Sequence, residues 1–451
     1  MSSPIPAQAS PERPYEPIPG ALKLISPYGC AFMRHCWADR RSLKEPEWYA
    51  AIQQATTLRH GREFAHALSR DYKGYNPAEV DEKFDHALEN PPVGCQWIRE
   101  NFPQSACATC PVKAPYHMAK KSILELVQAA DEPMKKFTHL DEHMERIHRF
   151  AAGETVGLST QFPGLDEYMR FRNSELIVIG AMQSIGKTQF MVDCMYRLAS
   201  AGIPVFGFSA ETGVDTLTDR FMSRAAEIDS RALRNERSTG PLTPDEWARL
   251  GAAKKELADL PIFLDFTSLS AEQVLAQVEA ALLQHNLPLD GPYVLFFDYL
   301  QFGAKMPGDD TEYDRISRLS SEFKFVAKIL DRPVVVFSQL RRDKEGDDEP
   351  DLTWFKGSGH IESDANTAII FTGKREHSAI VERLATIVKQ KEGQANVKVM
   401  FHVQQQSGLW ESESTPGPNE LVGAQALLGF DVTQRSPFLP TGFKQGPHDE
   451  V

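Results

Sequence analysis

An apolar run that ends in a phosphate-binding pattern constrains the fold of this chain more than any other feature. The run Leu176–Ile179 lies between Glu175 and Gly180, as is typical of a strand buried on both faces of a parallel sheet. The residues Gly186-Lys187-Thr188 follow it and open a helical pattern. Backbone N–H groups at a helix start and the helix dipole stabilise an anion at the same place. The sequence therefore predicts an α/β fold that binds a nucleotide.

The residues of this loop predict how ATP and Mg²⁺ bind. In the pattern G-x-x-x-x-G-K-[ST], the lysine reaches the outer phosphates and the hydroxyl binds Mg²⁺, so these roles fall to Lys187 and Thr188. The first glycine of the pattern is replaced here by Ala181. The other residues expected to contact the nucleotide are Ala181, Ser184 and Gly186. An ordinary Gly-Lys-Thr loop is the alternative, which the strand before it and the helix after it disfavour.

Beyond Gly157 the sequence alternates strand and helix patterns for some 250 residues, and helical stretches separate the first four strands that follow the loop. The predicted strands are 204–210, 261–266, 293–299, 333–339, 368–374, 385–391 and 397–403. Such alternation predicts a mostly parallel sheet covered on both faces, with ligands at the carboxyl ends of the strands.

Polar residues stand at three of these strand ends. Asp298 ends an apolar run and can order the Mg²⁺ shell through water. Glu211 follows another strand and is the natural candidate for the base that activates water, although an acid at a helix start can also only complement the helix dipole. Gln339 ends a third strand, where it could sense the γ-phosphate or be an ordinary polar strand end.

Five of the six cysteines cluster before residue 111 and indicate a metal. The spacing of Cys107 and Cys110 lets two thiolates bind one tetrahedral ion. The predicted ligands of a structural Zn²⁺ are Cys30, Cys95, Cys107 and Cys110, with Cys36 and His35 as competitors. An iron–sulfur cluster or unliganded thiols are the alternatives. Cys194, alone in an apolar helical stretch, is expected to be a small core residue.

Composition and patterning divide the chain into five regions. Residues 1–25 are expected to form a disordered leader, 26–128 a helical zinc-binding module, 129–156 a linker helix, 157–411 the nucleotide-binding domain, and 412–451 a flexible tail.

The net charge of −13 argues against a surface that binds nucleic acid everywhere, so any DNA contact must be a local basic patch. No apolar stretch is long enough to span a membrane, and we expect a cytoplasmic protein.

The linker helix carries one apolar stripe. Leu140, Met144, Ile147 and Phe150 are three or four residues apart in an otherwise charged segment, 133–152. We expect this helix to dock on a neighbouring subunit; a mere tether is the alternative.

Seven motifs, in order, resemble the RecA-like motor domain of DnaB-type hexameric replicative helicases. They are 157–166, the phosphate loop, 208–211, 297–301, 337–340, 358–365 and 388–393. Residues 26–128 resemble, less closely, the cysteine-bearing helical segment that follows the catalytic core of phage and plasmid primase-helicases. Trp48, Tyr49, Gly61, Ser69 and Tyr75 carry that resemblance together with the cysteines.

The resemblance implies a hexameric ring in which each ATP lies between two subunits. In the family a lysine and an arginine two residues apart reach the neighbour's γ-phosphate, and this chain has Lys389 and Lys391 at these positions. A lysine supplies a point charge where an arginine would supply a bidentate clamp. Arg375 and Arg383 are nearby alternatives.

The resemblance also implies DNA contact through loops that face the ring channel. The corresponding residues are Arg341, Arg342, Lys356, Gly357 and Gly359, which combine basic side chains with glycines that let backbone N–H groups approach phosphates. Four acids between 345 and 349 support the alternative of a solvated charged loop.

Two functions of different class follow from these patterns. The first is an ATP-driven ring helicase that translocates on single-stranded DNA, encoded by a phage or mobile element. The second is a RecA-like regulatory or loader ATPase that binds DNA or a primase partner without unwinding. The match at 358–365 favours the first, and a primase or a helicase loader is a further expected partner.

Overall fold

Two compact units make up the computed structural model of the chain. It describes residues 18–102, 107, 110, 112–128, 140–152, 156–182, 185–238, 240–298, 300–341, 349–355, 358–376, 379–404 and 406–413. The first unit, named here the helical unit, comprises residues 1–133, 272–291 and 329–331. The second, named the sheet unit, comprises residues 134–271, 292–328 and 332–451.

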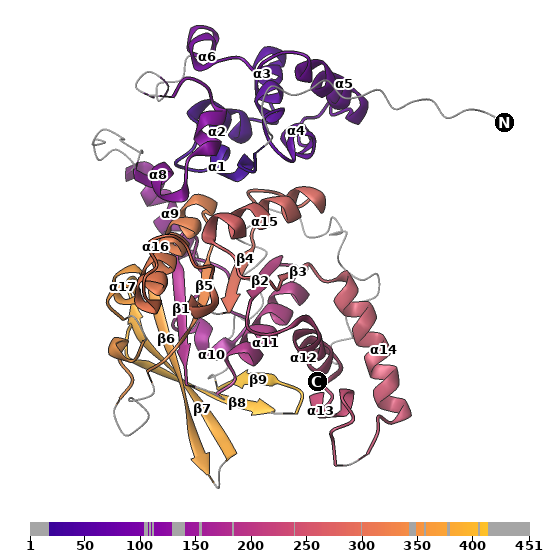
Figure 1. Ribbon diagram of the computed structural model, residues 1–451, viewed down its shortest axis with the longest axis vertical. Coiled ribbons are helices and arrows are strands. Elements are labelled where there is room, and N and C mark those ends of the chain that lie inside the picture. The colour runs from indigo at the N-terminus through magenta and orange to yellow at the C-terminus, as the bar shows by residue number, and fades with distance from the viewer. Residues whose placement is uncertain are drawn as a thin grey trace, which may run out of the picture. The chain divides into compact units, whose positions relative to one another are not determined.

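A mixed sheet, nine-stranded in the described part of the chain, is the framework of the sheet unit (Figure 1). Its strands are β1 (Leu176–Ala181), β2 (Val205–Ser209), β3 (Ile262–Asp265), β4 (Val294–Asp298), β5 (Val334–Gln339), β6 (Thr367–Glu376), β7 (Ala379–Gln390), β8 (Val397–Gln404) and β9 (Leu409–Ser412). In the order β3-β2-β4-β5-β1-β6-β7-β8-β9, neighbours are parallel up to β6 and antiparallel beyond it. All residues of β1 are buried, as a strand covered on both faces requires.

The mostly parallel sheet expected from the sequence is confirmed. Each predicted strand overlaps an observed one, and only β7 begins far from its expected start, at Ala379 rather than residue 385. The short strand β9 was not expected, because four residues carry too little pattern to distinguish a strand from a loop.

Helices cover the sheet or pack on one another, and α14 packs along α12 (Figure 1). The α-helices of the sheet unit are α9 (Leu140–Ala151), α10 (Pro163–Asp166), α11 (Lys187–Ser200), α12 (Val214–Ala226), α13 (Ser230–Leu233), α14 (Pro244–Asp259), α16 (Glu312–Leu330, whose last two residues fall in the helical unit) and α17 (Ser358–Asp364). The described 3₁₀ helices include η2 (Leu300–Phe302) and η4 (Leu352–Trp354). None of the described helices combines the length and the apolar character that crossing a membrane requires.

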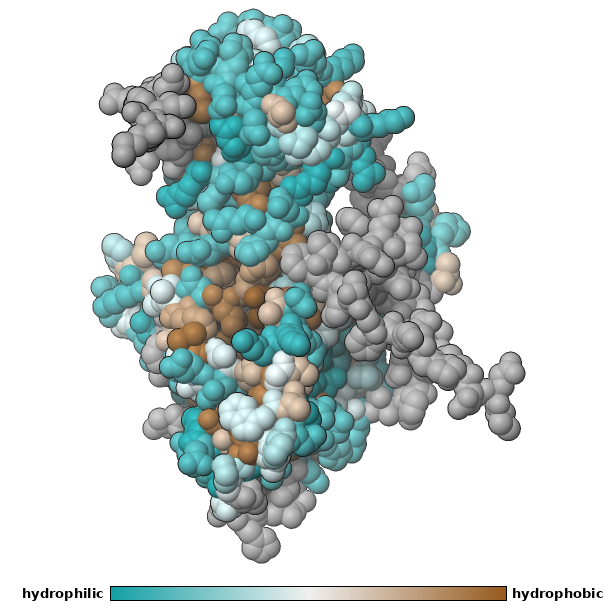
Figure 2. All heavy atoms as spheres, turned by 90° about the vertical axis from the view of Figure 1, so that its right-hand side faces the viewer, coloured by the Kyte–Doolittle hydropathy of each residue, from teal (hydrophilic) through white to brown (hydrophobic). Residues whose placement is uncertain are grey.

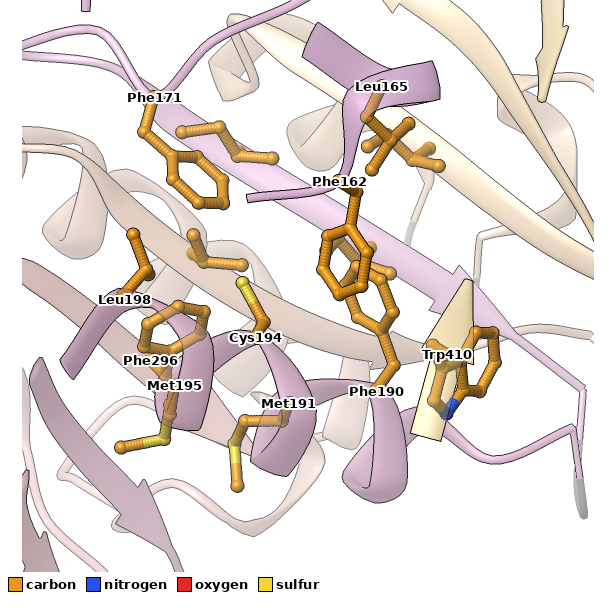
Figure 3. Packing of buried hydrophobic residues seen from close by; sticks show 14 of the residues in the cluster. Phe162, Leu165, Phe171, Phe190, Met191, Cys194, Met195, Leu198, Phe296 and Trp410 are labelled. Carbon is orange, nitrogen blue, oxygen red and sulfur yellow. The ribbon is translucent and has the colours of Figure 1, made fainter. Parts of the chain in front are cut away.

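The core of the sheet unit is centred on α11 (Figure 3). Phe190 stacks on Phe162 with ring centroids 5.0 Å apart, and its other neighbours include Trp410 at 5.3 Å. Cys194 is fully buried in the same cluster, which confirms its expected role as a small core residue. The helix that carries the phosphate loop is therefore fixed by packing along its length.

A buried carboxylate fastens β9 to α11. Asp193 is fully buried and forms ion pairs with Arg197, at 3.0 Å, and with Arg224. It also accepts a hydrogen bond of 3.0 Å from the backbone N–H of Trp410, while Arg197 donates one of 2.7 Å to the Trp410 carbonyl. Because a buried charge left unpaired costs about 3–5 kcal/mol, this cluster holds β9 firmly against the phosphate-loop helix.

The helical unit consists of short helices. They are α1 (Ala21–Ile25), α2 (Ala31–Ala38), α3 (Glu45–Ala55), α4 (Gly61–Ser69), α5 (Pro77–Leu88), α6 (Cys95–Asn101), α7 (Tyr116–Lys120), α8 (Ile123–Gln128) and α15 (Ala271–Gln284), the last belonging to this unit from residue 272 on. Within the helical module expected at 26–128, the sequence carries helical patterns at 45–58, 77–88 and 114–127, and the first two match α3 and α5. The pattern predicted at 114–127 is split into α7 and α8.

The leader predicted to end at residue 25 extends too far, because residues 21–25 form α1 with buried Ala21, Leu22 and Leu24. The fully buried carboxylate of Glu279 on α15 accepts hydrogen bonds of 2.9 and 3.0 Å from the N–H groups of Gly20 and Leu22. These bonds satisfy donors that a helix start leaves open. Residues 1–17 and the tail beyond residue 413 lie outside the described part.

Candidate nucleotide-binding site

A cavity of about 620 Å³ opens at the carboxyl ends of β1 and β5. This volume falls within the range of small-molecule and cofactor sites. The cavity brings together five of the residues predicted for ATP binding or catalysis: Gly186, Lys187, Thr188, Glu211 and Gln339. Ser184 lies outside the described residues. The complete lining is Met182, Gly186, Lys187, Thr188, Gln189, Glu211, Thr212, Gly213, Thr216, Arg220, Ser230, Arg234 and Gln339.

The phosphate loop depends on a glycine at its end. Gly186 has φ +107° and caps α11, a backbone conformation that other residues adopt only with strain. A Cβ at this position would also come within 3.1 Å of the Trp410 ring. Ala181, the residue at the first glycine position of the pattern, is buried at the end of β1 opposite Gln339 of β5. The loop therefore begins at a buried strand end and finishes at the start of a helix, as an anion cradle requires.

The predicted magnesium residues are hydrogen-bonded to each other. The Thr188 hydroxyl donates to Asp298 Oδ2 at 2.8 Å, and Asp298 is fully buried at the end of β4. The other carboxylate oxygen, Oδ1, is buried without a hydrogen-bond partner among the described residues. Burial raises the pKa of Asp298, whereas the Thr188 hydrogen bond and the Lys187 charge lower it. A buried acceptor with an unused oxygen beside a threonine hydroxyl fits a bound divalent cation with its water shell.

The charges around this pair are arranged for phosphate chemistry. Burial lowers the pKa of Lys187, and the carboxylates of Asp298 and Glu211 partly offset that effect. Glu211 is exposed to the cavity just after β2. Gln339, at the end of β5, donates its backbone N–H to Oε1 of the buried Gln301 at 3.4 Å. The site thus combines the Lys187 ammonium, the exposed Glu211 carboxylate and the Gln339 amide around the expected phosphates.

Two arginines of the cavity were missed by the sequence analysis. Arg220 on α12 is half-buried, and burial lowers its pKa while the nearby Asp298 and Glu211 raise it. Arg234 lines the same cavity and pairs with Asp219 at 3.3 Å. The available signal was the position of Arg220 on the helix that follows Glu211, but an arginine on an amphipathic helix is usually a solvated residue. Both add positive charge to the cavity beyond that of the phosphate loop.

Lys389 and Lys391 do not line this cavity. The Lys391 N–H donates to the Asn366 carbonyl, and the Asn366 N–H donates to the carbonyl of Leu176, which is the first residue of β1. The lysines therefore lie at the amino edge of the sheet, about 17 Å along β1 from the phosphate loop. Lys389 donates a hydrogen bond to the Glu362 carbonyl of α17. Burial and the neighbouring lysines lower the pKa values of both Lys389 and Lys391.

Arg383, considered as an alternative finger, has a different role in the structure. Its Nε donates to the Ile185 carbonyl in the chain's own phosphate loop at 2.7 Å, and its guanidinium lies 5.2 Å from the Trp410 ring centroid. It is buried, so it supports the loop and is not presented to a neighbour. The side chain of Arg375 lies outside the described residues.

The residues predicted to contact DNA are only partly described. Leu340 and Phe355 form an antiparallel bridge, and the exposed Arg341 donates its N–H to the Trp354 carbonyl at 2.8 Å. Gly359 lies in the first turn of α17. Arg342, Lys356 and Gly357 lie outside the described residues. The two ends of the predicted DNA loop are thus held side by side at the end of β5.

The cysteines predicted to bind zinc converge but are not arranged around a common point. Burial raises the pKa values of Cys30, Cys95 and Cys107, and the charges of neighbouring cysteines, Cys110 among them, raise them further, which shows that the four thiols lie close together. Burial raises the pKa of Cys30 to about 12 and that of Cys95 to about 11. Arg99 donates hydrogen bonds of 2.8 Å to the carbonyls of Cys107 and Cys110. Within the described residues, no group of three or more His, Cys, Asp or Glu side chains is placed to hold a metal ion.

Comparison with known sequences follows the same division of the chain. Residues 157–407 match the family described as the DnaB-like helicase C terminal domain. The replicative DNA helicase DnaB of Rickettsia prowazekii (strain Madrid E) is 33% identical over 237 residues, which cover 49% of this chain and 47% of that protein. The replicative DNA helicase DnaC of Bacillus subtilis (strain 168) is 28% identical over 293 residues, covering 61% and 62%. The chain thus spans about half the length of the first of these curated relatives.

Two solved structures share the fold. One, an ATPase domain, has a TM-score of 0.56 at 20% identity, covering 62% of this chain and all of that chain. The other, a DnaB-like replicative helicase described with its interactions with primase, has a TM-score of 0.56 at 19% identity, covering 77% of this chain and 82% of that chain. At these identities the similarity shows a common fold.

Two substitutions test the roles of the phosphate loop and the exposed acid. Lys187→Ala is expected to abolish ATP hydrolysis, because no other group of the described loop supplies its charge to the phosphates. Glu211→Gln is expected to keep ATP affinity and to lower turnover by about 10²-fold or more, the usual scale for a general base. Steady-state ATPase assays and binding of a fluorescent ATP analogue measure both, with Asp215→Asn, an acid on the adjacent α12, as control. Unchanged turnover in Glu211→Gln would leave Glu211 as a residue that only complements a helix dipole.

Proposed function

The chain belongs to the family of DnaB-like helicase C-terminal domains, and from this membership we propose that it is an ATP-driven replicative DNA helicase that translocates on single-stranded DNA as a hexameric ring. The relatives named above are replicative DNA helicases, and Lys187, Glu211 and Gln339, three of the residues expected to act in catalysis, line one cavity. The partial coverage of those relatives makes the activity of the whole protein a proposal.

The separation of the catalytic residues is the observation that carries the ring proposal. Lys187, Thr188 and Glu211 line the cavity at the carboxyl edge of the sheet, whereas Lys389 and Lys391 lie at the amino edge. A strand length of protein separates the two groups within one chain, so the lysines can reach a nucleotide only on another subunit. A contact that joins opposite edges of identical subunits is head-to-tail, and such contacts close into rings when the rotation permits.

The residues of the cavity have distinct roles in the proposed hydrolysis of ATP. The phosphate-loop N–H groups and Lys187 bind the phosphates, and Thr188 and Asp298 would hold Mg²⁺, which neutralises phosphate charge when bound. Glu211 accepts the proton of the attacking water, and Gln339 contacts the γ-phosphate. Lys389 and Lys391 of the neighbouring subunit stabilise the charge that develops on the phosphoryl group.

DNA contact is assigned to the loop that begins after β5. Arg341, Arg342 and Lys356 supply positive charge, and Gly357 and Gly359 allow close approach of the backbone to phosphates. The bridge between Leu340 and Phe355 supports this assignment, because it joins the loop directly to the strand that ends in Gln339.

A primase or a helicase loader is the further partner that we propose, and the solved DnaB-like helicase described with its interactions with primase supports this proposal. The cysteine-bearing segment supports a phage or mobile-element source.

The linker helix α9 is proposed to dock on the neighbouring subunit. Leu140, Met144 and Ile147 are 51, 48 and 43% exposed on one stripe of a helix that is otherwise charged. Exposed apolar side chains lower solubility unless a partner covers them. A second copy of the chain is the partner that ring closure supplies.

A structural zinc ion is proposed for Cys30, Cys95, Cys107 and Cys110. Convergence of the four thiols and the hydrogen bonds from Arg99, which hold the Cys107 and Cys110 backbone in place, support it. Zinc binding requires the thiols to lose their protons and to move to about 2.3 Å from one ion, and the energy of the metal bonds drives both changes.

An assay of forked-duplex unwinding distinguishes the proposed helicase function from that of a regulatory ATPase. Wild-type protein with ATP and Mg²⁺ is expected to displace the labelled strand, and Lys187→Ala, which lacks the phosphate-binding charge, is expected to displace none. ATP hydrolysis that single-stranded DNA stimulates, without strand displacement on any fork polarity, would favour the regulatory or loader function instead.

Charge on the stripe of α9 is expected to weaken ring assembly. Ile147→Asp with Phe150→Asp would place two carboxylates in the proposed interface, so light scattering should show smaller particles and ATPase per subunit should fall. High protein concentration should partly restore both by mass action. The control is His148→Asp with Arg149→Asp on the charged part of the same helix. Full-size rings with undiminished DNA-stimulated hydrolysis would reduce α9 to a tether.

Elemental analysis of the purified protein tests whether the cysteines bind the proposed zinc ion. Purified protein is expected to contain about one zinc per chain, and Cys107→Ser with Cys110→Ser should lose it and destabilise the helical unit, whereas Cys194→Ser should keep it. A brown protein that absorbs near 400 nm would indicate an iron–sulfur cluster instead. Protein without metal would leave these residues as reduced thiols.

A further inference from the structure

The helical unit contains a cavity that the proposed motor does not use. Its volume is about 210 Å³, and it lies between the start of α3 and the segment that joins α4 to α5. Its lining is Arg40, Leu43, Glu45, Trp48, Ser69, Tyr72, Gly74, Tyr75, Asn76, Glu79 and Val80. Three aromatic rings in so small a cavity form a site for a flat group.

The aromatic side chains are held by contacts of their own. The Trp48 N–H donates to Ser69 Oγ at 2.8 Å, and the Tyr75 hydroxyl is 2.9 Å from His66 Nδ1. Tyr72 is 49% exposed, yet its ring lies so close to Gly74 that a Cβ there would come within 2.9 Å of it. The polar atoms of Trp48 and Tyr75 are therefore already occupied, and the rings are fixed before any ligand binds.

The segments that line the cavity carry exposed basic side chains without an ion-pair partner among the described residues. Two acids of these segments are paired with cations, Asp71 with Arg40 at 2.8 Å and Glu45 with Lys83 at 3.0 Å, whereas the lining acid Glu79 forms no ion pair with a described residue. Arg41, Lys44 and Lys73, all exposed in the same segments, form no ion pair with any described residue. We name these three residues the basic rim. On the face shown in Figure 2 the helical unit presents a mainly hydrophilic surface.

We propose that this cavity binds one base of a single-stranded nucleic acid, with the neighbouring phosphates on the basic rim. Stacking on fixed aromatic rings together with backbone contacts from Lys and Arg is how proteins bind single strands without reading their sequence. Glu79 and Asn76 at the cavity supply an acceptor and an amide for the edge of the base. The site lies in the helical unit and needs no residue of the motor.

A basic side chain of a partner protein is the competing ligand, because aromatic rings and a carboxylate also suit a cation. The charge of the rim decides against it. The segments that line the cavity carry three exposed cations that form no ion pair with a described residue, whereas Glu79 is the only lining acid in that condition. A cation would therefore be repelled on approach, and a phosphate chain would be attracted.

Photocrosslinking of the full-length protein to single strands that carry 5-iodouracil tests the proposal, because this base crosslinks to aromatic rings stacked on it. DNA and RNA strands are used in parallel, so that the two sources of the same chemistry are distinguished. We expect peptide mapping to find adducts on Trp48, Tyr72 or Tyr75. Adducts confined to residues 157–413 would overturn the proposal and leave the motor assignment untouched.

Substitutions at the cavity give a second measurement. Tyr72→Leu is expected to remove the adduct and to weaken binding of a short oligonucleotide about tenfold, the scale of one stacked base. The matched control is Trp247→Leu, an aromatic residue that is 62% exposed on α14 and lines neither cavity. Equal affinity in Tyr72→Leu and wild type would overturn the proposal.

The rim is tested by charge reversal. Arg41→Glu with Lys73→Glu should weaken oligonucleotide binding and reduce the dependence of the logarithm of affinity on the logarithm of salt concentration by about one to two. Lys113→Glu with Lys120→Glu makes the same charge change elsewhere on the helical unit and should have a much smaller effect. Capture of an oligolysine peptide, with no loss of oligonucleotide affinity in the rim variant, would identify the cavity as a site for basic side chains instead.

Discussion

The pairing of β1 between β5 and β6 is the constraint on which the nucleotide site depends. This register places Ala181 opposite Gln339 on one side and opposite Phe371 on the other, so the phosphate loop leaves a strand that is buried and paired along its whole length. The loop then ends at Gly186, where Trp410 fills the space behind it and Arg383 binds the Ile185 carbonyl. The phosphate loop is therefore fixed by contacts at its start and at its end, so anion binding requires no reorganisation of its backbone.

Much of this arrangement could be predicted from local sequence. A buried parallel strand needs a continuous apolar run, and Leu176–Ile179, Val294–Phe297 and Val334–Phe337 supply one each. Because parallel strands end at one edge of the sheet, polar residues after such runs meet there, and Thr188 does bind Asp298 at 2.8 Å. The roles of the phosphate-loop residues and of Glu211 were predicted in this way, and five of the predicted residues line one cavity.

Residues that depend on tertiary contacts could not be found in the sequence. Arg220 acts through its position on α12 beside Asp298 and Glu211, and nothing in its neighbours distinguishes it from a solvated arginine. Trp410 is fixed by Asp193, 217 residues earlier in the chain, so its short strand carries no local signal. The same holds for Glu279, which binds the start of α1 and so brings α15 into the helical unit. The predicted boundary at residue 25 was wrong because that contact is remote.

Lys391 stands where the resemblance to DnaB-type helicases implies an arginine, and a lysine there changes the electrostatics of the proposed subunit contact. Lys389 and Lys391 lie close to Lys324, and Lys391 also lies near Lys328, so partial burial and the like charges lower the pKa values of both. Lysines in such surroundings gain more from an approaching anion than isolated surface lysines do, since the anion relieves their repulsion as well as binding them. Several close ammonium groups can thereby supply charge that a single guanidinium supplies elsewhere, although without its bidentate geometry. The lysines at the amino edge of the sheet can thus bind the phosphate of a nucleotide on a neighbouring subunit, whereas the nucleotide site of their own chain lies at the opposite edge.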